Sequence, residues 1–308
     1  MMKWGVAVNV HEQYQQTIEL ASLADAAELN YIWIVDFPAP RFAPAIAAKI
    51  ASMTGSSRIG IGLLPSLIYE PDYVVRFAET LATEFGERFD LLIGPGDKEA
   101  LGTIGKKEWV PGKVARKTVD NALKIKHGLE ILDIDCPVWL AAQGPKMIAK
   151  SMELDGVLLN LTDSQMIKWA LNILDERSTS FRVGIFSPTK LTKVEDTPSS
   201  DFLYSAAIVA LGASQPLMQH LGFEDVIQSA RQIYSNYNKL SPRVLEEIGV
   251  ENLLKWGFFS TPDKLVQSIN QLGEIGVDTT IFGPPISHTK ESVNLLLTAF
   301  GIYRDSKD

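Results

Sequence analysis

The stretch FDLLIGPGDK, residues 89–98, places a short apolar run directly before a turn rich in glycine and proline. The apolar run is nearly continuous, which is typical of a strand buried on both faces of a parallel sheet. The two glycines around Pro95 allow the backbone to approach a flat ligand closely, and Asp97 and Lys98 add a carboxylate and an ammonium. An ordinary tight turn after a strand would have the same spacing.

Similar apolar runs recur along the chain, separated by segments of helical period. This alternation predicts parallel strands joined by right-handed helical crossovers. The eight expected strands are residues 4–10, 31–36, 59–64, 89–93, 138–142, 156–160, 182–186 and 279–282. The expected helices are residues 14–28, 43–52, 72–85, 114–132, 146–154, 164–179 and 289–303. Eight strands predict an α/β fold, the (β/α)₈ TIM barrel.

One long segment departs from a minimal barrel. Residues 187–276 hold several helical patterns instead of one, so we expect a helical excursion before the last strand. Within it, residues 187–201 are rich in Pro, Ser, Thr and charge, which predicts an exposed loop near the barrel mouth. Thr261 and Pro262 are expected to be the N-cap and first residue of a helix. The 308 residues are expected to form a single domain, residues 1–308.

The composition excludes several classes of function. The chain has 37 acidic and 29 basic residues and a formal charge of −8, so nucleic acid is not an expected partner. We expect no membrane segment, because no apolar run is long enough to span a bilayer, and no signal peptide, because the first residues lack an apolar stretch. A lone cysteine, Cys136, and the lack of a clustered ligand motif predict a cytoplasmic protein without a metal site.

The stretch AAQGPK, residues 141–146, runs from a strand into a helix. Gly144 is flexible, Pro145 suits the first helical turn, and Lys146 adds a positive charge. Free N–H groups at a helix start favour an anion such as phosphate. An ordinary strand-to-helix turn without a ligand is the alternative.

Two other strand ends also border the expected mouth. The stretch GIGLLPS, residues 60–66, has glycines inside a strand, which indicate either a bend or a close approach of the backbone to a ligand. The stretch WIVDFP, residues 33–38, ends its strand on Asp36. This aspartate could face a ligand, or it could serve only as a cap or turn residue.

Together these segments resemble the luciferase-like barrel family, and within it the coenzyme F420-dependent methylenetetrahydromethanopterin reductases. The resemblance is carried by GPGDKEALGTIG with residues 108–110, by VWLAAQGPKMI, and by residues 272–277 and 283–286. It runs in order from residue 3 to residue 300, although residues 187–255 match only loosely.

The resemblance implies an oxidoreductase of archaeal one-carbon metabolism that transfers a hydride between a deazaflavin and a small molecule carried on a pterin. It implies coenzyme F420 as cofactor, with FMN as the alternative, no metal, and a homodimer or higher homo-oligomer. A non-prolyl cis peptide is expected at Gly62-Leu63, behind the deazaflavin ring. Asp97, Gln143 and Asp36 are the expected catalytic or positioning residues. The expected cofactor-binding residues are Asp36, Gly62, Leu63, Leu64, Ser66, Gly94, Pro95, Gly96, Lys98, Ala142, Gln143, Gly144, Pro145 and Lys146.

One residue departs from the family pattern. The reductases have a glutamate on the first strand that is proposed to protonate the substrate, and the matching residue here is Ala7. A methyl group cannot be a general acid. Asp97, Asp36 or His11 could supply the proton, although each has a plain structural alternative.

Three hypotheses of function therefore stand. The first is an F420-dependent hydride-transfer enzyme, the second is an FMN-dependent monooxygenase or reductase, and the third is a non-catalytic cofactor-binding homologue. The small residues of the segment 45–51 could form an oligomer contact, or they could simply pack against the barrel.

Overall fold

Eight parallel strands close into a barrel, which confirms the predicted fold class. The structure is a computed structural model that describes residues 1–9, 13–36, 41–106, 109–174, 176–237 and 240–307. Strands β1 to β6 pair in sequence, β7 pairs with β6 and β9, and β9 pairs with β1. The barrel strands are β1 Lys3–Val8, β2 Tyr31–Ile34, β3 Arg58–Pro65, β4 Phe89–Gly94, β5 Val138–Ala142, β6 Gly156–Leu159, β7 Arg182–Leu191 and β9 Thr279–Gly283.

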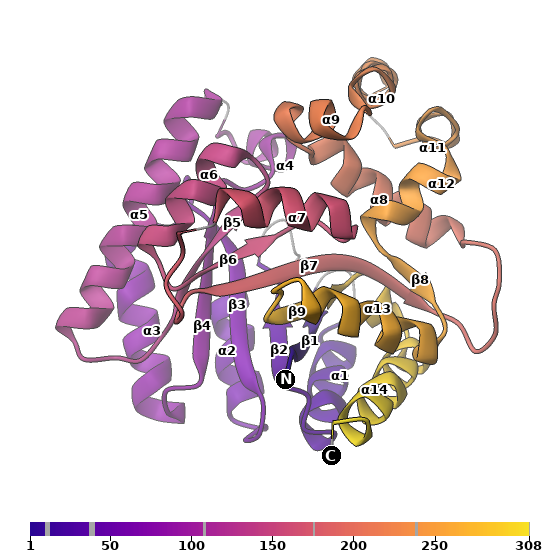
Figure 1. The fold of residues 1–308 in the computed structure, drawn as a ribbon. Helices are drawn as coiled ribbons and strands as arrows, with labels where there is room; N and C mark the ends of the chain where they lie inside the picture. The colour runs from indigo at the N-terminus through magenta and orange to yellow at the C-terminus, as the bar shows by residue number, and fades with distance from the viewer. Residues whose placement is uncertain (10–12, 37–40, 107–108, 175, 238–239, 308) are drawn as a thin grey trace.

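Helices surround this barrel, and most of the excursion helices gather at one end of it (Figure 1). The helices that follow barrel strands are α1 Tyr14–Ala26, α2 Ala43–Ala51, α3 Pro71–Phe85, α4 Lys98–Thr103, α5 Pro111–Ile131, α6 Pro145–Lys150, α7 Ser164–Ile173 and α14 Lys290–Asp305. The excursion helices are α8 Ser200–Gly212, α9 Gln215–Leu221, α10 Glu224–Tyr237, α11 Pro242–Ile248, α12 Val250–Leu253 and α13 Pro262–Glu274. Among the described residues, no helix is long and apolar enough to cross a bilayer.

The segment between the seventh and last barrel strands differs in part from its prediction. An extra strand, β8 Phe258–Ser260, lies within the excursion and pairs with the far end of β7. The prediction of an exposed loop from residue 187 is wrong for its first five residues, because β7 continues to Leu191 and Ser187 and Thr189 are fully buried. The predicted helix start is confirmed, with Thr261 as N-cap and Pro262 as the first residue of α13.

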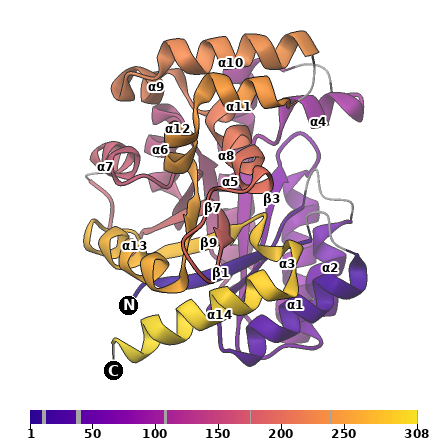
Figure 2. The same cartoon turned by 90° about the vertical axis from the view of Figure 1, so that its right-hand side faces the viewer.

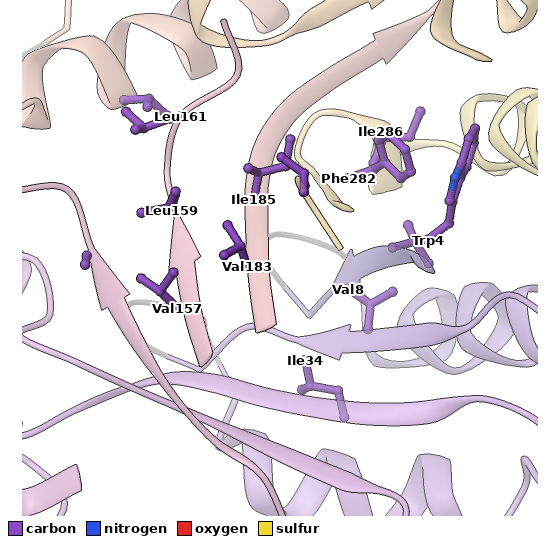
Figure 3. Close-up of a cluster of buried hydrophobic side chains, with 14 of the residues drawn as sticks. Trp4, Val8, Ile34, Val157, Leu159, Leu161, Val183, Ile185, Phe282 and Ile286 are labelled. Atoms are coloured by element: carbon purple, nitrogen blue, oxygen red, sulfur yellow. The ribbon is translucent and has the colours of Figure 1, made fainter. Parts of the chain in front are cut away.

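Alternate residues of the strands point outward and pack beneath the helices. Figure 3 shows this layer on β6 and β7, where Val157, Leu159, Val183 and Ile185 belong to one apolar cluster. The period of two follows from strand geometry, since successive side chains point to opposite faces. This outer layer holds the helices against the barrel.

The inside of the barrel is filled by aromatic side chains that glycines on other strands accommodate. A Cβ added at Gly60 would lie 2.0 Å from Cε3 of Trp33, and one added at Gly156 would lie 2.9 Å from Cε3 of Trp139. Both tryptophans are at most 1% exposed. One of the glycines of β3, Gly60, is therefore explained by Trp33, because any side chain at residue 60 would overlap the indole ring.

Below these rings, Asp90 lies at the N-terminal end of the barrel and is fully buried. Its carboxylate accepts hydrogen bonds from Tyr31 Oη at 3.1 Å, Trp139 Nε1 at 2.9 Å and Arg58 Nε at 2.8 Å. A buried charge is tolerated when it is paired and hydrogen-bonded, as here. This network closes one end of the barrel and leaves the other end for ligands.

Candidate active site

A cavity of about 560 Å³ lies beside the C-terminal ends of β3, β4, β5 and β6. This is the end of a TIM barrel where active sites are built, and the volume is in the range of small-molecule sites. The cavity is lined by Leu63, Pro95, Gly96, Asp97, Trp109, Pro111, Val114, Ala115, Ala141, Ala142, Gln143, Gly144, Met147, Leu158, Asn160, Ile208, Gly212 and Ser214.

Leu63 occupies a bulge in β3 and packs against the apolar interior of the barrel. The peptide bond between Gly62 and Leu63 is cis, which confirms the predicted conformation. Trp33 Nε1 donates a hydrogen bond to the Gly62 carbonyl at 2.9 Å. Gly62 has φ = +136°, a backbone conformation that other residues rarely adopt. Gly94 leaves space for the Leu63 side chain, since a Cβ at Gly94 would lie 2.1 Å from Leu63 Cδ1. The glycines thus let Leu63 line the cavity.

Gln143 and Asn160 directly follow the neighbouring strands β5 and β6. The strand pairing ends with Ala142 opposite Leu159, and Gln143 Nε2 then donates a hydrogen bond to the Asn160 carbonyl oxygen at 3.4 Å. The side-chain Oδ1 of Asn160 is buried and has no hydrogen-bond partner among the described residues.

Asp97 is an exposed residue at the cavity that also serves as a helix cap. Its Oδ1 accepts a hydrogen bond from the Ala100 N–H at 2.7 Å, which satisfies one free donor at the start of α4. The helix cap uses only this one carboxylate oxygen. The same residue can therefore hold the local backbone and present negative charge to a ligand.

Asp36 lies outside this cavity and lines a separate one of about 730 Å³. Its carboxylate accepts hydrogen bonds from the Ala43 N–H at 3.0 Å and from Tyr69 Oη at 2.8 Å. Burial raises the pKa of Asp36 above its ordinary value, and the two hydrogen bonds offset only part of that effect. In this geometry Asp36 fixes the start of α2 against Tyr69.

Known proteins resemble this chain over nearly its whole length. A 5,10-methylenetetrahydromethanopterin reductase from Archaeoglobus fulgidus is 24% identical, with 96% of this chain and 97% of the relative covered. The structure of the coenzyme F420-dependent tetrahydromethanopterin reductase from Methanopyrus kandleri superposes with a TM-score of 0.78 at 18% identity, covering 97% of this chain and 98% of that one. The fold is that of the luciferase-like barrels.

Two further luciferase-like barrels show the range of cofactors carried by this fold. An F420-dependent secondary alcohol dehydrogenase, solved with an F420-acetone adduct, has a TM-score of 0.72 at 13% identity and covers 98% and 99% of the two chains. The oxygenating constituent of a diketocamphane monooxygenase from Pseudomonas putida, solved with FMN, has a TM-score of 0.62 at 12% identity, with 96% of each chain covered. No protein-family profile matches the chain. The resemblance predicted from the sequence is confirmed at the level of fold and relatives.

The luciferase-like barrel brings only part of the predicted site into one cavity. The predicted residues that line the cavity are Leu63, Pro95, Gly96, Asp97, Ala142, Gln143 and Gly144. The predicted residues outside its lining are Asp36, Gly62, Leu64, Ser66, Gly94, Lys98, Pro145 and Lys146. Ser66 is 1% exposed and shares a 2.7 Å hydrogen bond with Thr118, so its hydroxyl is engaged inside the protein. His11 and Glu108 lie outside the described residues.

Several lining residues were missed by sequence reasoning. Asn160 follows β6 directly, so the rule that sites gather at strand ends could have found it. Ile208 and Ser214 come from the excursion, and nothing in their local sequence indicates a ligand. The Oγ of Ser214 is also buried and unpartnered within the part of the chain that is described. In those same residues, no group of His, Cys, Asp and Glu is arranged to hold a metal ion.

Proposed function

We propose that this chain is a coenzyme F420-dependent oxidoreductase that transfers a hydride between the deazaflavin and a small-molecule substrate. One observation carries the proposal. The cavity joins Leu63 of the β3 bulge, Gly96-Asp97 after β4 and Ala142–Gly144 after β5 in a single space, and these are the segments that resemble the F420-dependent reductases. The named relatives support the same cofactor class.

The residues present fit a flat, partly apolar cofactor with a polar tail. Leu63, Ala141 and Leu158 supply an apolar surface, whereas Gln143, Asn160 and Ser214 supply polar groups at the same cavity. Two of those polar groups have buried oxygens that lack partners in the described structure, as expected where a ligand completes the hydrogen bonding. A deazaflavin, when bound, supplies a carbon that can donate or accept a hydride.

The protein's own residues would then bind and orient. Leu63 would back the ring, and the backbone at Gly96 would border it closely because no side chain intervenes there. Gly144 to Lys146 would hold the phosphate through free backbone N–H groups at the start of α6 and the exposed Lys146 ammonium. Asp97 and Gln143 would position the substrate.

The substrate is a separate question, because Ala7 replaces the family's glutamate. Ala7 is fully buried and belongs to the same inner cluster as Trp33. No proton can come from this methyl group. We propose methylene-pterin as one candidate substrate and other small iminium or carbonyl compounds as the wider class.

Cofactor titration tests the proposal. The purified chain is titrated with coenzyme F420 and, separately, with FMN, following the fluorescence of each. Micromolar binding of F420, followed by a change in its absorbance on adding methylene-tetrahydromethanopterin or another acceptor, supports the proposal. Tight binding of FMN without binding of F420 contradicts it.

An FMN-dependent monooxygenase is the second candidate, and the likeness to the FMN-bound barrel from Pseudomonas putida favours it. The two candidates differ in their reaction with oxygen. Rapid oxygen consumption by the chain with reduced FMN and a substrate supports the monooxygenase, while the absence of such consumption with active F420 turnover excludes it. Cofactor binding without turnover of any acceptor would support a non-catalytic homologue.

A further inference from the structure

On the side formed by β5 and β6, the cavity has an apolar layer and, nearer the barrel mouth, a polar layer. Ala141 on β5 and Leu158 on β6 are paired neighbours whose side chains belong to the inner apolar cluster. Gln143 and Asn160 come two residues after them, each directly after the last residue of its strand, and all four residues line the cavity. The polar pair therefore lies one step nearer the mouth than the apolar pair.

The excursion extends this polar layer. A Cβ added at Gly212 would lie 3.4 Å from Gln143 Oε1, and one added at Gly144 would lie 3.6 Å from Ser214 Cβ. The turn between α8 and α9 thus packs directly on the end of β5. Arg231 on α10 holds this turn in place by donating to the carbonyls of Leu211 at 2.9 Å and Ala213 at 2.5 Å.

Two oxygens of the polar layer are left unsatisfied. Asn160 Oδ1 and Ser214 Oγ are each buried and accept or donate no hydrogen bond within the described residues. A buried polar atom without a partner destabilises a fold, so native proteins keep few of them. Both atoms belong to residues lining one cavity, which suggests a common partner that is a ligand.

We propose that Asn160 and Ser214 are ligand-binding residues that pair with hydroxyl groups on the chain linking the cofactor's ring to its phosphate. The inference rests on the proposed function. The ring would lie against Leu63 and Ala141 and the phosphate near Gly144 under the proposed function, and all three residues line the cavity together with Asn160 and Ser214. Asn160 adjoins Gln143, whose Nε2 donates to its carbonyl, and Ser214 packs beside Gly144. A polyhydroxylated linker that joins ring and phosphate carries the donors that Asn160 Oδ1 requires.

The assignment makes the excursion a determinant of ligand specificity. Ser214 lies in the segment where the resemblance to the reductases is loose, and Ile208 of the same wall is 64% exposed at the cavity. A ligand with a hydroxylated linker satisfies the polar layer, whereas a ligand with an alkyl linker of equal length leaves both oxygens unpaired. Rejection of the alkyl analogue follows from the cost of those unpaired groups.

The test uses Asn160→Ala, Asn160→Leu and Ser214→Ala in the full chain, with Asn172→Ala on the exposed surface of α7 as control. Two quantities are measured for each protein: the melting temperature without ligand and the Kd for coenzyme F420 and FMN. Asn160→Leu restores side-chain volume, so a packing defect in Asn160→Ala can be told from a lost hydrogen bond.

We expect melting temperatures without ligand that equal or exceed that of the wild type, since each variant removes an unsatisfied polar atom. We expect the Kd for the bound cofactor to rise about three- to tenfold in each variant and not in the control. A lower melting temperature in both Asn160 variants with unchanged Kd would show a structural role and overturn the inference. If the wild type binds and no variant changes Kd, this inference alone fails; if the wild type binds neither cofactor, the proposed function fails with it.

Discussion

Tyr234 on α10 donates a hydrogen bond to the Glu99 carboxylate on α4 with an oxygen–oxygen distance of 2.5 Å. The contact joins residues 135 positions apart in the chain. Glu99 follows the Gly96-Asp97 part of the cavity wall, and α10 also carries Arg231, which holds the turn before Ser214. Figure 2 shows α4 and α10 together at the end of the molecule that bears the excursion. The contact therefore connects the part of the cavity wall that precedes α4 with the part that α10 supports.

Tyr234→Phe is expected to weaken cofactor binding modestly and to speed cofactor release. An exposed side-chain pair contributes up to about 1 kcal/mol, so the Kd should rise at most about fivefold. Stopped-flow displacement of bound cofactor measures the release rate, and Tyr73→Phe on the exposed face of α3 is the control. Unchanged release in Tyr234→Phe would show that the contact does not brace the cavity.

The same contact predicts a pH dependence. The hydrogen bond to Glu99, with a smaller effect of burial, raises the pKa of Tyr234 to about 12. The phenol must be protonated to donate, so its stabilising effect is complete below the ordinary tyrosine pKa of about 10 and is lost as pH rises through 12. The difference in release rate between wild type and Tyr234→Phe should accordingly stay constant from pH 7 to about 9.

Gly94→Ala is expected to damage the cavity more than the fold. The new Cβ would lie 2.1 Å from Leu63 Cδ1 and 3.0 Å from Ala141 Cβ, so Leu63 must move. Overpacking of this kind costs about 1–3 kcal/mol, and we expect the Kd for the cofactor to rise at least about tenfold. Gly301→Ala on α14 is the control, because no atom lies within 4 Å of its added Cβ.

Denaturant unfolding and cofactor titration of both glycine variants separate the two effects. A Gly94→Ala protein that binds cofactor as tightly as the wild type would place the ring away from Leu63. Gly301→Ala should leave the Kd unchanged and raise stability by up to about 1 kcal/mol, since alanine favours a helix over glycine.

The barrel strands could be predicted from sequence because a strand buried on both faces is apolar almost throughout. The three residues of β8 are too few to give such a pattern, and their pairing with β7 is a long-range contact. Ser187 and Thr189 indicated a loop by their polarity, yet each is buried with its hydroxyl hydrogen-bonded, to Thr162 and to the Ser187 carbonyl. Single polar residues do not reveal whether the fold supplies them with partners.

Glycine motifs at strand ends identified part of the cavity lining from sequence, as at Gly96 and Gly144. The lining residues that come from the excursion, such as Ser214, could not be identified from sequence, because only tertiary packing brings them to the cavity. Asp36 shows a further limit. The position of this residue after β2 indicated the mouth of the barrel, but the Ala43 N–H and the Tyr69 hydroxyl engage its carboxylate in a neighbouring cavity. Sequence spacing places a residue at a strand end without fixing which neighbour it contacts.

Asp25→Ala is expected to lower the free energy of unfolding at neutral pH. The difference from wild type should be smaller at acid pH. Burial favours a higher pKa for Asp25, but hydrogen bonds from the backbone N–H groups of Ser57, Gly55 and Ser56 outweigh it and lower the pKa. A lowered carboxyl pKa stabilises the fold above the unfolded value of about 3.9, and this contribution is lost as pH falls through the folded pKa.

Urea unfolding of wild type and Asp25→Ala from pH 7 to pH 3 measures this effect. We expect a difference of about 1–3 kcal/mol that is constant above pH 5 and shrinks below about pH 4. Asp120→Ala on the exposed face of α5 should show no such dependence. A difference for Asp25→Ala that stays the same down to pH 3 would mean that its charge does not matter to these hydrogen bonds.

Ala7→Glu tests whether the chain can use a glutamate at the position where the sequence resemblance leads us to expect one. Ala7 is 0% exposed and packs in the inner cluster with Tyr31, Trp33 and Leu92, so the new carboxyl would have no solvent. Burying it without a partner should cost about 3 kcal/mol or more and yield no gain in pterin reduction, with Ala26→Glu on the exposed face of α1 as control. A stable Ala7→Glu protein with faster reduction of methylene-pterin would instead show that the interior can open around residue 7. An unstable Ala7→Glu protein without faster reduction would show that the packed aromatic interior leaves no room for an acid at residue 7.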